Sequence, residues 1–168
     1  MKLDTARLTL EPFSEHHFEE ASHIFTDDFV KKYLFDNKEL SQEEVLSFLK
    51  TSQQTFREKR HGLWIIAITG NEKLIGFTGL WHFFDKEQPQ LLYALLPAYT
   101  GKGYAREASL KVMDYAFHQL EFPHLDASCD TPNLSSHKTA EALGMKKLKE
   151  EGINDQSTTF YRKLKPQS

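Results

Sequence analysis

Gly101 and Gly103 flank Lys102 immediately before a segment whose apolar residues have helical spacing. Glycine is entropically costly inside regular structure, and it is favoured where the backbone needs a positive φ or must approach another group closely. The first turn of a helix has N–H groups without partners and carries the positive end of the helix dipole, so a glycine-rich turn that leads into a helix suits an anion. We therefore expect main-chain amides of this turn to hold a pyrophosphate group.

Two other phosphate-binding motifs share parts of this pattern. A P-loop requires G-x-x-x-x-G-K followed by serine or threonine, whereas Lys102 is followed by Gly103. A dinucleotide fingerprint, G-x-G-x-x-G, would need glycine where the chain has Arg106, although Asp126 lies about twenty residues on, as an acidic ribose ligand would. A Rossmann-type nucleotide site and a tight turn without any ligand stay open as alternatives.

Asn133 and Ser136 form a second candidate pair, at the start of another predicted helix. Asparagine is among the best N-cap residues, and a residue three positions further along a helix lies on the same side of it. The pair is therefore expected to present two polar groups together. A helix cap beside an exposed serine explains the same pattern without a ligand.

Strands and helices alternate around these groups. The apolar patterns predict strands over residues 3–11, 63–69, 74–84, 90–96, 125–129, 145–152 and 158–164. Helices are predicted to start after Ser14, Ser41, Gly103 and Asn133. Ser41 has the strongest of these start signals, because Glu44 three residues on completes a capping box. Together these elements predict an α/β domain in which the glycine turn joins a strand to a helix.

The composition fits one compact domain over residues 1–168. The chain is 39% hydrophobic and 27% charged, with a formal net charge of -3, so it can bury a core and has no general positive field to attract nucleic acid. Cys129 is its one cysteine, which excludes an intrachain disulfide, and no apolar run approaches the ~20 residues of a membrane span. No residue spacing matches a metal site. We therefore expect a soluble cytoplasmic protein without nucleic-acid, membrane or metal partners.

Three segments, LLYALLP, YTGKGYAREA and NLSSHKTAEALGM, occur in an order and spacing that resemble the GNAT acetyltransferase superfamily, particularly its RimJ/RimL-like branch. The resemblance extends from TARLTLEPF to TTFYRKL, nearly the whole chain. It implies a single-domain α/β GNAT fold: a mixed, mostly antiparallel sheet of about seven strands, about four flanking helices and a splayed central strand pair. In that family the motif Q/R-x-x-G-x-G/A binds the acetyl-CoA pyrophosphate, and here Thr100 takes the place of Gln or Arg.

The resemblance implies acetyl-CoA as co-substrate, bound by Leu95, Leu96, Gly101, Lys102, Gly103, Tyr104, Ala105, Arg106, Asn133 and Ser136. The two leucines would use main-chain groups, because the family's strand before the glycine turn splays from its neighbour. Ser136 would protonate the departing thiolate of coenzyme A. Many GNAT enzymes use a tyrosine on this helix instead, but this chain has none between Asn133 and Met145.

The general base is less clearly marked. Some family members use a glutamate on the strand before the turn, but residues 90–96 contain no carboxylate. His82 is the first candidate, because imidazole titrates near neutral pH. The others are Asp85, Glu87, Glu151 and Asp155, and a water chain to solvent would also serve. The sequence thus predicts direct acetyl transfer from acetyl-CoA to a primary amine, on a protein N-terminus or a small molecule, with a non-catalytic CoA-binding module as the alternative.

Overall fold

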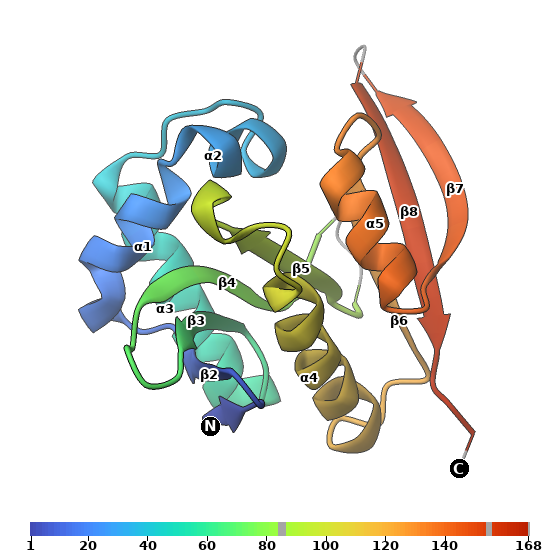
Figure 1. Cartoon of the computed structure of the whole chain (residues 1–168), viewed down its shortest axis with the longest axis horizontal. Coiled ribbons are helices and arrows are strands. Elements are labelled where there is room, and N and C mark those ends of the chain that lie inside the picture. The colour runs from blue at the N-terminus through green and yellow to red at the C-terminus, as the bar shows by residue number, and fades with distance from the viewer. Residues whose placement is uncertain (84–86, 154–155, 168) are drawn as a thin grey trace.

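The computed structural model describes residues 1–83, 87–153 and 156–167 (Figure 1). Within these ranges one eight-stranded sheet has the order β1-β2-β3-β4-β5-β6-β8-β7. The strands are β1 (Leu3–Asp4), β2 (Leu8–Pro12), β3 (Leu63–Ile68), β4 (Leu74–Trp81), β5 (Gln90–Leu95), β6 (His124–Asp130), β7 (Lys146–Ile153) and β8 (Gln156–Leu164). The helices are α1 (Phe18–Phe25), α2 (Asp28–Leu34), α3 (Gln42–Lys59), α4 (Tyr104–His118) and α5 (Leu134–Ala142), with 3₁₀ turns at Glu15–His17 and Pro97–Tyr99.

Two apolar clusters cover the two faces of the sheet. Ile65 of β3 packs with Phe25 and Phe77 on the face covered by α1, α2 and α3. The next residue, Ile66, packs with Val112 on the face covered by α4 and α5. Because successive side chains of a strand point to opposite faces, this central strand is buried on both sides. No helix within the described residues is long and apolar enough to cross a membrane.

The predicted fold class is confirmed, although two elements differ from the sequence prediction. The strand predicted over residues 3–11 is divided into β1 and β2, and α2 was not predicted. The Asp27 carboxylate caps α2 by accepting from the amides of Phe29 (2.9 Å) and Val30 (3.2 Å). With seven residues, of which only Val30 is buried, α2 is too short to show a helical period in the sequence.

Local start signals correctly placed α3, α4 and α5, whereas Ser14 is the N-cap of the 3₁₀ turn at Glu15–His17 and α1 begins after that turn. The capping box of Ser41 and Glu44 is formed at the start of α3, and Asn133 caps α5 by accepting from the Ser136 amide. Gly144, with a φ of +80°, follows the end of α5 in the left-handed conformation that favours glycine there.

The splayed central pair is formed by β5 and β6. These parallel strands are in register only at Leu91 and Ala127, whereas β5 pairs with β4 along its whole length, from Gln90 to Leu95. Beyond Leu91 the two strands diverge, toward the end of the sheet where α2 and α5 lie (Figure 1). The divergence divides the sheet and leaves room for a ligand between its halves.

Candidate functional site

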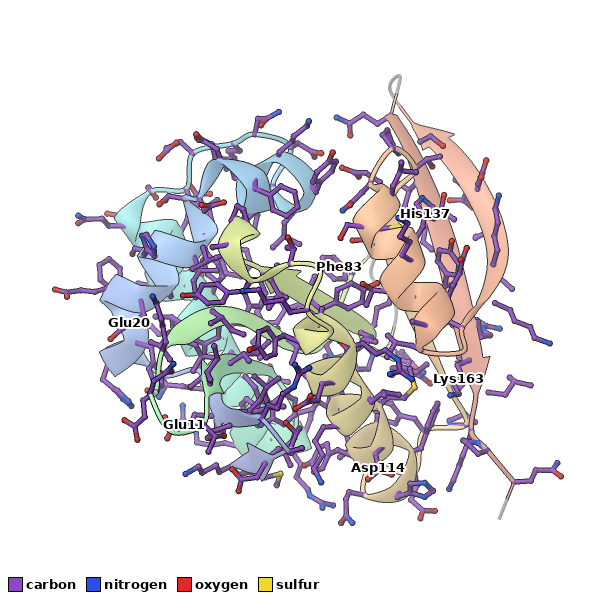
Figure 2. The ribbon with its side chains drawn as sticks, in the orientation of Figure 1. Glu11, Glu20, Phe83, Asp114, His137 and Lys163 are labelled. Carbon is purple, nitrogen blue, oxygen red and sulfur yellow. The ribbon has the colours of Figure 1, made fainter. Side chains whose placement is uncertain are left out.

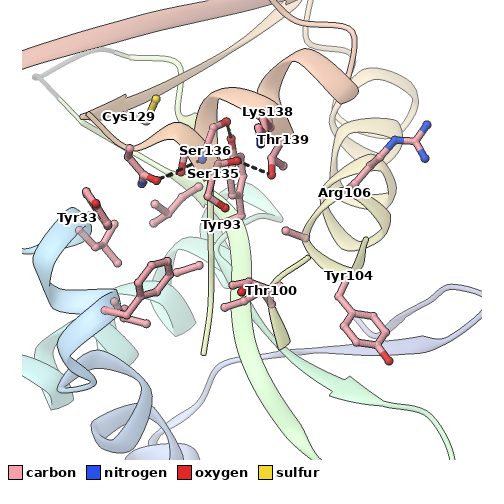
Figure 3. A pocket seen from close by; sticks show the side chains of 18 of the residues that line it. Tyr33, Tyr93, Thr100, Tyr104, Arg106, Cys129, Ser135, Ser136, Lys138 and Thr139 are labelled. Carbon is pink, nitrogen blue, oxygen red and sulfur yellow. Dashed lines mark hydrogen bonds between the residues drawn. The ribbon is translucent and has the colours of Figure 1, made fainter. Parts of the chain in front are cut away.

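A cavity of about 370 Å³ occupies the opening between β5 and β6 (Figure 3). Its walls come from α2, from β5, from the glycine turn with the start of α4, and from β6 with α5. The volume is near the lower end of the ~300–1,000 Å³ typical of small-molecule sites. One cavity therefore brings together the glycine turn and the Asn133–Ser136 pair, which are separate in the sequence.

The glycine turn has the geometry of an anion cradle. Gly101 and Gly103 have φ values of +78° and +82°, in the left-handed region that favours glycine. Gly103 is the N-cap of α4 and supplies no side-chain cap, so the first amides of the helix are left for another acceptor. The turn residues that line the cavity are Thr100, Gly101, Gly103, Tyr104, Ala105 and Arg106. Lys102 is not among the lining residues.

Arg7, between β1 and β2, supports this turn from behind. Its Nη1 donates to the Lys102 carbonyl (3.1 Å), its Nε to Glu107 Oε1 (2.7 Å), and its guanidinium lies 4.4 Å from the Tyr104 ring centroid. Burial acts to raise the pKa of Glu107, but hydrogen bonds from Thr5 and Arg7 outweigh it and lower the pKa below its usual value. The charged pair therefore joins the start of the chain to the first turn of α4. No local sequence signal predicts this contact, because it joins residues one hundred positions apart.

Leu95 and Leu96 differ in their relation to the cavity. Leu95 lines it, while the Leu96 amide donates to the Ile75 carbonyl of β4 (2.8 Å). Successive peptide N–H groups of a strand point to opposite edges, so the Leu95 amide points toward the opening between β5 and β6. Of the two predicted main-chain contacts, the structure brings only that of Leu95 to the cavity.

Asn133 and Ser136 line the cavity together from the start of α5. Asn133 Nδ2 donates to Ser136 Oγ (2.9 Å), and the Ser136 amide donates to Asn133 Oδ1 (3.3 Å). From the opposite wall, the Tyr93 hydroxyl donates to the Ser136 carbonyl (3.0 Å), and burial raises the Tyr93 pKa far above its usual value. Because Ser136 Oγ accepts from Asn133, its own proton is available to a group inside the cavity.

His137 fixes the helix that carries this pair. It projects from α5 toward β8 (Figure 2), where its Nδ1 lies 2.6 Å from the Tyr161 hydroxyl, and its Nε2 lies 2.8 Å from the Thr131 carbonyl. A carbonyl only accepts, so Nε2 carries the proton and Nδ1 accepts from Tyr161. These two contacts make His137 a brace for α5.

Cys129 lines the cavity from β6. Burial, with a smaller contribution from the Asp130 charge, raises the pKa of its thiol to about 11. A thiol with that pKa is almost entirely protonated near neutral pH, and only the thiolate is a good nucleophile. The side chain therefore contributes to the cavity wall as a neutral group.

The candidate bases among the described residues do not line this cavity. His82 lines a second cavity of about 520 Å³, together with Arg60, His61 and Glu87, so the structure does not bring His82 to Ser136. Glu151 is exposed on β7 and pairs with Lys149 (2.7 Å). Asp85 and Asp155 lie outside the described residues. None of the described residues that line the first cavity is an aspartate, a glutamate or a histidine.

One wall of the cavity comes from the helix that the sequence did not predict. Phe29, Val30, Tyr33 and Leu34 line it from α2. The spacing of Phe29 and Tyr33, whose ring centroids lie 5.8 Å apart, is the one signal that could have revealed this face. Within the described residues, no three His, Cys, Asp or Glu side chains are grouped so that they could hold a metal ion.

Comparisons with known proteins find relatives over most of the chain. The family described as "Acetyltransferase (GNAT) domain" matches residues 7–146. The uncharacterized N-acetyltransferase YnaD of Bacillus subtilis (strain 168) is 22% identical over 147 residues, which cover 88% of this chain and 84% of that protein.

Solved structures show the same fold. A putative GnaT-family acetyltransferase from Bordetella pertussis superimposes with a TM-score of 0.85 at 19% identity, covering 98% of this chain and 99% of that one. The structure of RimL, a ribosomal alpha-N-protein acetyltransferase, in complex with coenzyme A gives a TM-score of 0.82 at 14% identity, with 98% of each chain covered.

Proposed function

This chain belongs to the GNAT acetyltransferase family, and from that premise we propose that it transfers the acetyl group of acetyl-CoA directly to a primary amine, on a protein N-terminus or a small molecule. The chain is an acyltransferase, and GNAT acetyltransferases use acetyl-CoA. We place it in the RimJ/RimL-like branch and expect it in the cytoplasm. The single observation that carries the proposal is the cavity that joins the glycine turn to Asn133 and Ser136.

The residues that line the cavity suit two parts of acetyl-CoA, its diphosphate at the glycine turn and its thioester arm near Asn133. At the turn, a Cβ added to Gly101 would meet nothing within 4 Å, so the backbone is open to a close approach by a phosphate. The amides at the start of α4 would hold the diphosphate, and Arg106 and Lys138 would add positive charge. At the other end, the Leu95 amide and the Asn133 side chain, which both line the cavity, would orient the thioester arm. When bound, acetyl-CoA supplies an activated acyl group.

The protein's own part in the reaction is to orient two reactants and to move protons. The amine must react in its uncharged form, and a proton must reach the departing thiolate. Ser136 is the proposed proton donor, because its hydroxyl accepts from Asn133 and faces the cavity. Since no described lining residue is a carboxylate or an imidazole, we propose that the amine loses its proton to water. The neutral Cys129 thiol favours direct transfer over an acyl-cysteine intermediate.

A screen for release of free coenzyme A thiol tests this function. Acetyl-CoA would be offered with N-terminal peptides, polyamines, aminoglycosides and simple monoamines, and thiol release above the rate without acceptor is the expected result. A mass increase of one acetyl group on the amine would identify the product. Tight binding of coenzyme A without turnover on any amine would instead support the non-catalytic CoA-binding module.

Arg7→Lys is expected to weaken acetyl-CoA binding without slowing the chemical step. Lysine keeps the charge but lacks the planar fork that contacts both the Lys102 carbonyl and Glu107. The turn would be less preorganised, so the KM for acetyl-CoA is expected to rise by roughly fivefold to tenfold, with kcat within about twofold. Steady-state kinetics with varied acetyl-CoA measure both constants.

Arg57→Ala is the matched control, because Arg57 is an exposed arginine at the end of α3. Both constants are expected to stay at their wild-type values in this variant. A fall in kcat with an unchanged KM in Arg7→Lys would contradict a role for Arg7 in positioning the turn.

A further inference from the structure

The two ends of the cavity differ in chemistry. Ser136 lies between Arg106 of α4 on one side and Tyr33 of α2 on the other in the close view (Figure 3). The α4 end has the glycine turn, helix amides and positive side chains, which suit the phosphates of coenzyme A. The α2 end is therefore the part of the cavity left for the acceptor amine.

The α2 end is apolar and aromatic. Phe29, Val30, Tyr33 and Leu34 line it from the helix, and Leu92 lines it from β5. Such a wall stabilises an acceptor that buries apolar surface against it. The thioester arm must share the 370 Å³ of the cavity, so the remaining space suits a small group.

The charges of the cavity disfavour an acceptor with a second ammonium group. The charged side chains among its described lining residues are Arg106 and Lys138, and both are positive. The reacting amine becomes neutral before transfer, but a second ammonium in the cavity would be desolvated without a counter-ion.

From this arrangement we propose that the acceptor is a small primary amine that carries an apolar group and no second positive charge, and that α2 selects it. The proposal rests on the proposed function, and it names the acceptor class for the same site. The apolar group packs against Phe29, Tyr33 and Leu34, while the amine points toward Ser136 and the acetyl group.

Two carboxylates near the cavity define the competing possibility. Asp36 follows α2, and Asp130 ends β6, so each is close in sequence to a wall of the cavity, but neither lines it. Burial raises the pKa of Asp130, and repulsion from the Asp36 carboxylate raises it further. A diamine with its distal ammonium between them would show the opposite selectivity.

Hexylamine and hexamethylenediamine test the proposal directly, because they differ only by one terminal ammonium. We expect kcat/KM to favour hexylamine by at least about tenfold. Calorimetric titration of each amine into the complex of the protein with coenzyme A should show the same preference without turnover. Tyr33→Glu places a carboxylate on the α2 wall and is expected to shift the kcat/KM ratio toward the diamine by about tenfold or more, whereas Tyr33→Phe keeps the wild-type ratio.

A change in the ratio separates selection from instability, since a poorly folded variant would lose activity on both amines alike. Equal or better use of hexamethylenediamine by the wild type would overturn the proposal and favour the site at Asp36 and Asp130. An unchanged ratio in Tyr33→Glu would show that α2 does not select the acceptor. Turnover of other amines without turnover of hexylamine would overturn the acceptor class and leave the proposed function intact. No turnover of any amine by a protein that binds coenzyme A would overturn the function, and the acceptor class with it.

Discussion

Gly103→Val is expected to abolish tight coenzyme A binding while the protein stays folded. Gly103 has a φ of +82° and is the N-cap of α4, and a Cβ at this position would lie 3.4 Å from Arg7 Nη2. A left-handed conformation costs a non-glycine residue on the order of 1–3 kcal/mol, and a β-branched side chain is especially unsuited to it. The turn is therefore expected to relax, so that its amides no longer converge on the diphosphate.

The expected loss of affinity is about 100-fold or more, since each 1.4 kcal/mol corresponds to about a factor of ten. Calorimetry with coenzyme A measures the affinity, and a melting temperature within roughly 10 °C of the wild type would show that the fold survives. Lys102→Ala is the neighbouring control. Lys102 does not line the cavity, so the affinity of this variant for coenzyme A is expected to stay within about threefold of the wild-type value. An unchanged affinity in a folded Gly103→Val protein would move the anion site away from this turn.

Ser136→Ala is expected to lower kcat by on the order of 10²-fold, the low end for loss of a positioned general acid. The hydroxyl lies in the cavity and accepts from Asn133 Nδ2 (2.9 Å), which directs its proton away from Asn133. A group that acts only in the transition state lowers kcat and kcat/KM together, whereas a binding contact mainly raises KM. Acetyl-CoA affinity is therefore expected to change little. Steady-state kinetics with one accepted amine measure these constants.

Asn133→Ala distinguishes the proton donor from the helix cap. Asn133 caps α5 through the Ser136 amide, so its loss is expected to cost about 1 kcal/mol of unfolding free energy. Ser136→Ala leaves this cap in place but removes the acceptor of Asn133 Nδ2, so it is also expected to cost about 1 kcal/mol of unfolding free energy, and kcat is the measurement that separates the two variants. A wild-type kcat in Ser136→Ala would remove Ser136 from the mechanism and leave water as the proton donor.

The sequence determined the features that depend on neighbouring residues. Such local features are each decided within about one helical turn. They are the positive φ of Gly101 and Gly103, the cap at Asn133 and the capping box of Ser41. The order of the strands and helices predicted an α/β domain, and the three segments around the glycine turn predicted its fold class by resemblance, whereas the anion site at the turn stays a prediction.

Only the tertiary structure decided which distant groups meet. Arg7 reaches Glu107 across one hundred residues, Tyr93 reaches Ser136 from another wall, and His82 is placed at a second cavity. No local signal marks such contacts, because they arise from how the two halves of the sheet diverge and how the helices pack on them. The short helix α2 shows the same limit: its single buried residue, Val30, gives no period in the sequence, and its role in the cavity follows from its position opposite β6 and α5. A short helix is stabilised mainly by packing rather than by its own propensity, so its place and its function are set by the rest of the fold.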